Sequence, residues 1–413
     1  MKDLQQRLAQ FGIMIPDILL PRPGLDTEKW AVIACDQFTQ DRNYWEAVKA
    51  KTAGVPSALN IIFPEIYLQD AGKESRIAAI RSSMELYLKD EVFSPPRTCA
   101  VYIERSTPHN ALRRGLALAV DLEHYNWKPG AKPFIRATEE TIEERLPPRM
   151  EIRRNAPLET PHILLLIDDE KDFLLPALAE KAKKAPPLYS ANLMMNSGSL
   201  TGWALDSVEG INLLADGLEK LKSKADAGGF LFAVGDGNHS LATAKAVWEE
   251  YKSARQGEAG IENHPARWAL VEMENLYDPG ISFEPIHRII FGADPIELHK
   301  TVSMGLGIAC RPPEHGKRVV KIESSGFADP GLQPLLDNYV RQNGFEIDYI
   351  HGEEELFRLT EDSSRPAAGL LMPPVSKSEL FKTVARSGPL PRKSFSMGEA
   401  VEKRFYFECR RLF

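Results

Sequence analysis

The sequence predicts an α+β (mixed α/β) protein, in which mixed sheets are flanked by helices, and three observations support this class. Strand-like and helix-like segments alternate along the chain. Several neighbouring strand-like segments are joined by short turn signals, which are typical of hairpins. Apolar residues make up 43% and charged residues 26% of the sequence, as in soluble globular proteins. Hairpins mixed with helices argue against a purely parallel, doubly wound sheet.

The first third of the chain supplies strands and one long helix. Residues 29–37 are expected to form a buried strand that ends in polar groups. Residues 73–92 carry apolar side chains at helical spacing. Residues 99–106 and 115–125 are expected to be two strands that pair with each other.

The central part continues the alternation. Residues 162–169 are expected to form a buried strand, 194–205 a hairpin and 206–225 a helix. Residues 267–276 and 281–291 resemble two strands joined by Tyr-Asp-Pro-Gly, a strong turn signal. We therefore expect these two strands to be neighbours.

The final third repeats the pattern of strand and helix. Residues 332–344 predict a helix, and residues 346–352 and 367–374 predict strands. Ser396 and Glu399 have the spacing of a helix capping box. The alternation therefore extends to the last residues of the sequence.

The length of 413 residues exceeds that of one ordinary core, so several closely packed lobes are expected. We predict an N-terminal α/β lobe at 1–155 and a central lobe at 156–292. A C-terminal α/β lobe is predicted at 293–413.

Composition narrows the function classes. A net charge of −7 makes nucleic acid an unlikely partner and leaves a small molecule as the expected substrate. No apolar run approaches the roughly 20 residues of a membrane span, and no secretory signal is expected at the start. The four cysteines lack CxxC spacing, so a reduced cytoplasm is the expected setting. The oligomeric state is left open, with a homo-oligomer as one option.

The stretch with the most chemical content is 230–245, FLFAVGDGNHSLATAK, where an apolar strand meets a helix. Gly235 and Gly237 permit positive φ and close approach of the backbone. The N–H groups at the start of the helix suit an anion such as phosphate. Asp236 stands at the end of the strand, where ligands of open sheets commonly bind.

A purely structural interpretation of this turn is equally supported by its spacing. Asn238, His239 or Ser240 would then cap the first turn of the helix. The motif is not a Walker A loop, because the Gly-Lys-Ser/Thr ending is missing and Lys245 comes too late.

The turn resembles the signature of the family catalogued as domain of unknown function 1015, and the resemblance covers nearly the whole chain. The other matching stretches are KWAVIACDQFTQDRNYWEAV, IRATEETIEERLPPR, RWALVEMENLYDPGISFEPIHRIIF, EIDYIHGE and LPRKSFSMGEAVEKRFYFE. Many members carry Asp-Gly-His-His-Arg in the turn, which is similar to the phosphate loop of the ParB/sulfiredoxin superfamily. That superfamily includes free-serine kinases, so the resemblance implies a ParB/sulfiredoxin-like core.

The resemblance implies a nucleotide-dependent phosphotransferase that acts on a serine-like hydroxyl and uses ATP or ADP with Mg²⁺. This chain departs from the pattern, because Asn238 replaces the first His and Ser240 replaces the Arg. Loss of the guanidinium removes a bidentate phosphate donor, so a kinase needs a cation from elsewhere. The alternative is a regulatory protein that binds a nucleotide or metabolite without turnover.

The candidate site residues follow from these arguments. The predicted catalytic residues are Asp36, Asp236 and His239. The residues predicted to bind the nucleotide are Gly235, Gly237, Asn238, Ser240, Arg136, Arg149 and Lys393. The predicted Mg²⁺ ligands are Asp236 and Glu272, because Mg²⁺ prefers carboxylate oxygens.

Each candidate residue outside the turn can also be explained by a purely structural role. Asp36 would otherwise cap a helix, and Arg136 and Arg149 would pair with interleaved glutamates on a solvated helix. Lys393, next to Arg392, would otherwise belong to a surface loop. His287 either lines the same cleft as His239 or is a core histidine.

Overall fold

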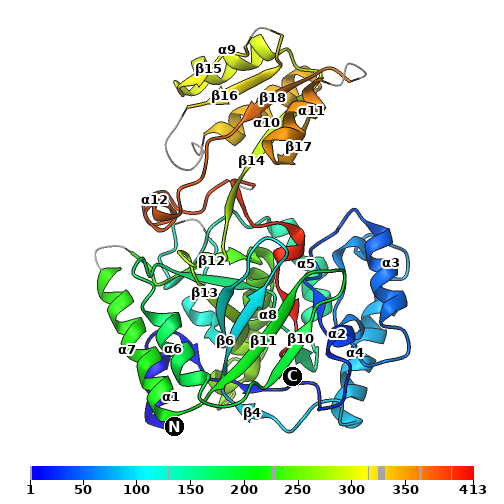
Figure 1. Cartoon of the computed structure of the whole chain (residues 1–413), viewed down its shortest axis with the longest axis vertical. Helices are drawn as coiled ribbons and strands as arrows, with labels where there is room; N and C mark the ends of the chain where they lie inside the picture. Colours follow the sequence, from blue (N-terminus) through cyan, green and yellow to red (C-terminus); the bar gives the residue numbers. More distant parts are fainter. Residues whose placement is uncertain are drawn as a thin grey trace. The chain divides into compact units, whose positions relative to one another are not determined.

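The computed structural model describes residues 2–128, 130–225, 229–314, 316–323, 331–361, 365–391 and 393–413. It divides into two compact units (Figure 1). The larger unit comprises Met1–Ala137, Thr141–Ile281 and Glu399–Phe413, and the smaller comprises Thr138–Glu140 and Ser282–Gly398. The fold class is mixed α/β, as predicted.

A nine-stranded sheet forms the centre of the larger unit, in the order β10-β11-β5-β6-β13-β9-β12-β7, with β1 also paired to β6. Its strands are β1 (Ile13–Met14), β5 (Ala100–Ser106), β6 (Arg113–Asp121), β7 (Ile135–Ala137), β9 (Leu164–Ile167), β10 (Tyr189–Asn192), β11 (Ser199–Leu205), β12 (Phe232–Asp236) and β13 (Trp268–Asn275). Two neighbouring pairs are parallel, β13 with β9 and β12 with β7, and the others are antiparallel.

The central strands of this sheet are buried on both faces, because helices pack against the sheet. The helices of the larger unit are α1 (Lys2–Ala9), α2 (Thr27–Trp30), α3 (Arg42–Lys51), α4 (Lys73–Lys89), α5 (Leu146–Arg153), α6 (Leu174–Ala182), α7 (Val208–Lys224) and α8 (Asn238–Ala254). Helix α5 packs on α8, and α6 packs on α7 and on strands β5, β6 and β11.

The last residues of the chain return to the larger unit and pair with its early strands. Strand β20 (Phe405–Tyr406) pairs with β3 (Val32–Ile33), and β21 (Arg410–Arg411) pairs with β8 (Leu158–Glu159). Two further short strands, β2 (Asp17–Ile18) and β4 (Arg97–Thr98), pair with each other.

Arg404 anchors this C-terminal segment inside the protein. Its guanidinium is buried, forms ion pairs with Glu272 and Glu408, and donates to the carbonyl oxygen of Pro161 at 3.0 Å. Trp30 adds a hydrogen bond from Nε1 to the carbonyl oxygen of Phe407 at 3.0 Å. The segment is therefore held by paired charges as well as by strand pairing.

The smaller unit is built on a second mixed sheet, ordered β15-β16-β18-β14-β17, with β19 also paired to β14. Its strands are β14 (Phe283–Phe291), β15 (Cys310–Arg311), β16 (Val319–Ile322), β17 (Glu346–His351), β18 (Ala367–Leu371) and β19 (Phe395–Met397). Its helices are α9 (Pro295–Leu306), α10 (Leu332–Asn343), α11 (Glu353–Glu361) and α12 (Leu380–Ser387).

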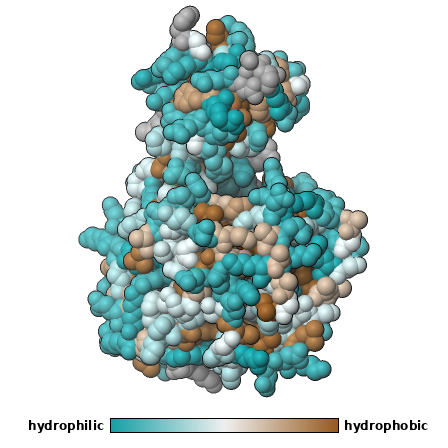
Figure 2. Space-filling view, turned by 45° about the vertical axis from the view of Figure 1, so that its right-hand side comes forward, coloured by the Kyte–Doolittle hydropathy of each residue, from teal (hydrophilic) through white to brown (hydrophobic). Residues whose placement is uncertain are grey.

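The molecular surface is mostly hydrophilic on the face seen in Figure 2. Among the described residues, the large hydrophobic side chains that are exposed are Leu86, Leu112, Val208, Ile296 and Met304. None of the described helices has the length and apolar character needed to cross a membrane.

Several local predictions need correction. Residues 29–37 contain the end of α2 and the two-residue β3 rather than one strand, because Asp26 caps a short helix there. Strands β13 and β14 are not neighbours but belong to different sheets. The capping box is formed by Glu399 and Glu402 instead of Ser396 and Glu399.

The regions expected as the first two lobes, 1–155 and 156–292, contribute strands to one and the same sheet of the larger unit. The main segment of the smaller unit starts at Ser282, eleven residues before the expected start of the third lobe at residue 293.

Replacing Arg404 by Met should lower the free energy of unfolding of the larger unit by about 3–5 kcal/mol, because two buried carboxylates lose their partner. The exposed pair Arg97–Asp206 provides the control: Arg97→Met should cost no more than about 1 kcal/mol. Tryptophan fluorescence during urea unfolding reports this unit alone, since all 6 tryptophans lie in it. Equal losses in the two variants would contradict the anchoring role.

Candidate active site

The predicted strand-to-helix corner is present, and it is shaped by Gly237. Strand β12 ends at Asp236, Gly237 follows with φ of +79°, and α8 begins at Asn238. This backbone angle favours glycine, and a Cβ atom at position 237 would also lie within 3.1 Å of the Cα of Ile163, a tight contact that Ile163 would have to relieve by a small shift. Gly235 instead lies where the register of β12 against β9 shifts.

The N-terminus of α8 presents backbone N–H groups at this corner. Its N-cap residue is Gly237, which makes no side-chain cap hydrogen bond, so the predicted capping by Asn238, His239 or Ser240 is wrong. The first N–H groups of any helix have no partner within the helix, and its dipole favours negative charge there. The corner therefore has the local structure of an anion site.

Asp236 is ionised and paired at the same corner. Its Oδ1 accepts from the Gly237 N–H at 2.9 Å, and its Oδ2 lies 3.1 Å from the Nζ of Lys403. Burial alone would raise the pKa of Asp236, but the Lys403 ammonium outweighs it and holds this pKa below its ordinary value. Lys403 was not predicted from the sequence. The signal that could have found it is the position of Lys403 and Arg404 directly before the apolar run FYF, which indicates that both cations are buried.

His162 lies at the centre of the site, and sequence reasoning missed it as well. Its Nε2 lies 2.6 Å from the Oγ of Ser240 and 3.9 Å from the Oδ2 of Asp36. It precedes β9, whose Leu164 pairs with Asp236 across the sheet. His162 thereby lies between the predicted catalytic carboxylate of Asp36 and Ser240 in the first turn of α8.

Tyr406 and Cys35 hold the other side of the His162 ring. The Oη of Tyr406 lies 2.7 Å from His162 Nδ1 and accepts from the Cys35 N–H at 3.1 Å. Burial, followed by the Asp36 carboxylate, raises the pKa of the Cys35 thiol. Burial, followed by the Cys35 and Asp36 charges, likewise raises the pKa of Tyr406, so both groups keep their protons at neutral pH.

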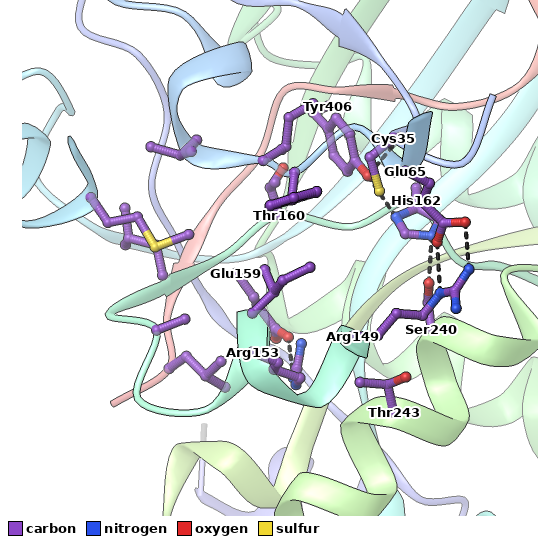
Figure 3. Close-up of a pocket in the computed structure, with 18 of the residues that line it drawn as sticks. Cys35, Glu65, Arg149, Arg153, Glu159, Thr160, His162, Ser240, Thr243 and Tyr406 are labelled. Atoms are coloured by element: carbon purple, nitrogen blue, oxygen red, sulfur yellow. Dashed lines mark hydrogen bonds and ion pairs between the residues drawn. The ribbon is translucent and has the colours of Figure 1, made fainter. Parts of the chain in front are cut away.

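A cavity of about 150 Å³ lies beside this cluster (Figure 3). Cys35, His162, Ser240 and Tyr406 form a polar side of its wall, as Figure 3 shows. Its apolar wall is formed by Ile61, Ile62, Phe63, Leu68, Met84, Ile152, Ala156, Leu158 and Leu412. A largely apolar pocket with a few convergent polar groups is typical of small-molecule sites.

The charged residues on the cavity wall are paired with each other. Arg149 donates from Nε to Glu65 Oε1 at 2.6 Å and pairs through Nη2 with the second oxygen of Glu65. Arg153 pairs with Glu159 at 2.5 Å. Arg149 thus meets a glutamate distant in sequence, and not one of the neighbouring glutamates.

His239 is a neutral imidazole in the folded protein. Its Nε2 accepts a hydrogen bond from the Ile142 N–H at 3.2 Å, which requires that this nitrogen carry no proton. Burial, with the Arg149 and Arg145 charges as smaller causes, lowers the pKa of His239 to about 4.

Two further predicted residues, Asp36 and Asn238, belong to the surroundings of the corner. Asp36 accepts from the Gln37 side chain at 3.0 Å and does not cap a helix, since Asp41 caps α3. Asn238 is the first residue of α8.

Other predicted site residues have separate surroundings. Arg136 lies opposite Ala233 in β12, and its guanidinium stands 4.6 Å from the centre of the Phe230 ring. Lys393 is exposed and belongs to the smaller unit, whereas Arg392 falls outside the described residues. His287 is buried in the smaller unit, where Nδ1 accepts from the Met372 N–H at 3.1 Å.

The predicted metal ligands do not form a resident metal site. Asp236 and Glu272 flank Leu164 from opposite sides, two strand spacings or roughly 10 Å apart. Each is already paired with a cation, Lys403 or Arg404. Among the described residues, no group of three or more His, Cys, Asp or Glu side chains is placed to hold a metal ion.

The neutral state of His239 predicts a pH effect on stability. Below pH 6.5 the unfolded chain binds a proton at this residue, while the folded chain does not until about pH 4, so stability falls as the pH falls through this window. His239→Gln keeps an acceptor for Ile142 but does not titrate. Relative to this variant, the wild type should lose about 1–2 kcal/mol between pH 7 and pH 4.5 in urea titrations. Parallel pH profiles for both proteins would disprove the assignment.

Two solved structures that align with this chain share little sequence with it. A conserved hypothetical protein from Pyrococcus furiosus aligns with 12% identity and a TM-score of 0.35, over 72% of this chain and 97% of its own. A free serine kinase in complex with AMP aligns with 10% identity and a TM-score of 0.37, over 70% of this chain and 90% of its own. TM-scores this low transfer no function, and no curated protein matches the sequence.

Residues 19–343 match the family described as "Protein of unknown function (DUF1015)". The match covers most of the 413 residues and includes the strand-to-helix corner at Asp236. The chain therefore belongs to this family.

Proposed function

We propose that the protein is a nucleotide-dependent phosphotransferase that acts on a small-molecule hydroxyl such as that of a serine-like compound. The observation that supports this proposal is the corner at the end of β12. There the amide groups of the α8 N-terminus stand beside the ionised Asp236 and the ammonium of Lys403.

The phosphate side of the proposed site combines the helix N-terminus with Lys403. A helix dipole contributes only about 0.3–1 kcal/mol to anion binding, so a cation is needed for useful affinity. Ser240 cannot supply it. The proposed cation is Lys403, whose side chain is 10% exposed and which would contact the phosphate while it stays paired with Asp236. The cation that the turn lacks thus comes from a residue more than 160 positions later in the sequence.

The hydroxyl side of the proposed site uses carboxylates. Asp236 stays ionised because Lys403 keeps its pKa low, and the Oδ2 of Asp36 lies 3.9 Å from His162 Nε2. Kinases place an aspartate beside the attacking hydroxyl to orient it and accept its proton. Asp36 and Asp236 are the proposed candidates for this role, on a ParB/sulfiredoxin-like core.

A nucleotide-binding or metabolite-binding regulator is the second candidate, and the pairing of charges favours it. Arg149 is neutralised by Glu65, and His239 is uncharged at neutral pH. Few cations are then left to stabilise the charge that develops during phosphoryl transfer. Because the protein has no resident site for Mg²⁺ among the described residues, a divalent ion would arrive with the nucleotide.

Nucleotide binding tests the corner directly. Calorimetric titration with MgADP and MgATP should give an affinity that Lys403→Met weakens by about 10-fold or more, since a charge-assisted contact contributes about 1.5–3 kcal/mol. Lys181 on α6, which pairs with Glu209 on α7, provides a matched control, and Lys181→Met should bind as the wild type does. The double variant Asp236→Asn, Lys403→Met avoids an unpaired buried charge and should also bind weakly.

Transfer of the labelled γ-phosphate of ATP to a panel of hydroxylated amino acids separates the two candidates. Transfer that is lost in Asp236→Asn establishes the enzyme. Binding without transfer supports the regulator. Unchanged binding in Lys403→Met and in the double variant would refute the corner as a phosphate site.

A further inference from the structure

We propose that Ser240 is a nucleophile activated by His162 and that the adjoining cavity binds an uncharged acyl ester with a short apolar group. This activity is separate from the proposed phosphotransfer and does not depend on it. It is carried by a continuous chain of contacts through Ser240, His162, Tyr406 and Cys35.

The first contact has the geometry of a nucleophile and its base. The Oγ of Ser240 lies 2.6 Å from the Nε2 of His162, within the range required for proton transfer. Both side chains line the cavity, so a bound molecule would meet the hydroxyl directly. Ser240 lies in the first turn of α8, where the helix dipole favours a developing oxyanion.

The second contact orients the imidazole. Tyr406 Oη accepts the Cys35 N–H at 3.1 Å and has a second lone pair for a proton on His162 Nδ1, 2.7 Å away. With the proton on Nδ1, Nε2 carries a free lone pair that faces Ser240. Tyr406 is thus a positioning residue, in the place that a carboxylate takes in a serine hydrolase triad.

A carboxylate is nevertheless close to the ring. Asp36 Oδ2 lies 3.9 Å from His162 Nε2, and its side chain is 24% exposed. This negative charge would stabilise the imidazolium that forms when Nε2 takes the Ser240 proton. The site therefore has a nucleophile, a base, an orienting group and a compensating charge.

The cavity selects the substrate class by its size and lining. A volume of about 150 Å³ suits a short acyl group but is small for a nucleotide. Beyond the polar side, the wall is mostly apolar. The two arginines on the wall, Arg149 and Arg153, are already paired with Glu65 and Glu159. No strong charge on this wall is therefore left over for an ionic substrate, and an uncharged ester fits it.

The chemistry is ordinary acyl transfer. Ser240 Oγ forms a bond to the carbonyl carbon as its proton moves to His162 Nε2, and the ester C–O bond breaks as the alcohol leaves with that proton. Water then attacks the acyl-serine and gives a proton to His162 Nε2. As the bond between the acyl carbon and Oγ breaks, His162 returns that proton to Ser240 Oγ, and the carboxylic acid is released.

Labelling with a fluorophosphonate probe tests the nucleophile. The Ser240 Oγ should form a bond to phosphorus as fluoride leaves, and peptide mass spectrometry should locate the label on Ser240. Ser240→Ala should abolish labelling, and His162→Gln should slow it by about 100-fold or more. Ser190→Ala, which removes an exposed serine hydroxyl on β10, is the control and should label as the wild type does.

Hydrolysis of p-nitrophenyl esters tests the cavity and the role of Tyr406. Acetyl and butyryl esters should react faster than octanoyl esters, and Ile61→Trp, which fills the cavity, should remove the butyryl activity first. Tyr406→Phe should lower kcat with little change in KM. Absence of a label on Ser240 in wild-type protein with an unchanged tryptophan fluorescence spectrum would overturn the proposal, whatever the outcome of the phosphotransfer assays.

Discussion

Paired charges between the C-terminal segment and the central sheet are the interactions on which this site depends. Lys403 meets Asp236 at the end of β12, and Arg404 meets Glu272 on β13 and Glu408. A few residues later, Arg410 donates to Glu159 in β8. Buried charges need their partners in place, because a single missing partner leaves a charge in a low-dielectric interior. The segment can therefore lie on the sheet in one register only.

That register assembles the site from distant parts of the sequence. Once Lys403 is placed, Tyr406 reaches the ring of His162, and β20 pairs with β3, which leads to Cys35 and Asp36. Helix α8 then brings Ser240 to the other ring nitrogen. The anchoring of the segment and the charge at the corner are linked, since the ion pair that holds the segment also keeps Asp236 ionised beside the helix N-terminus.

Local features of the fold could be predicted from the sequence because they depend on neighbouring residues. The apolar spacing of α4, the pairing of β5 with β6 and the strand-to-helix corner at Gly237 all appear as predicted. The partners of the corner could not be predicted. His162 lies just before the apolar strand β9, and its proximity to Asp236 arises from the order of strands in the sheet. The place of β14 in a second sheet could not be predicted either. The turn signal before β14 indicates a hairpin with β13, whereas the strands that pair with β14 all come later in the sequence.

The central claim is that the α8 corner is where an anionic ligand binds. Hydrogen–deuterium exchange measures it most directly, because the amides of the first helical turn would themselves contact the ligand. Addition of MgADP should slow exchange in peptides that cover residues 236–241 and 400–406, while peptides from α9 and α10 keep their rates. Slower exchange confined to other regions, or no change at the corner under saturating nucleotide, would contradict the account.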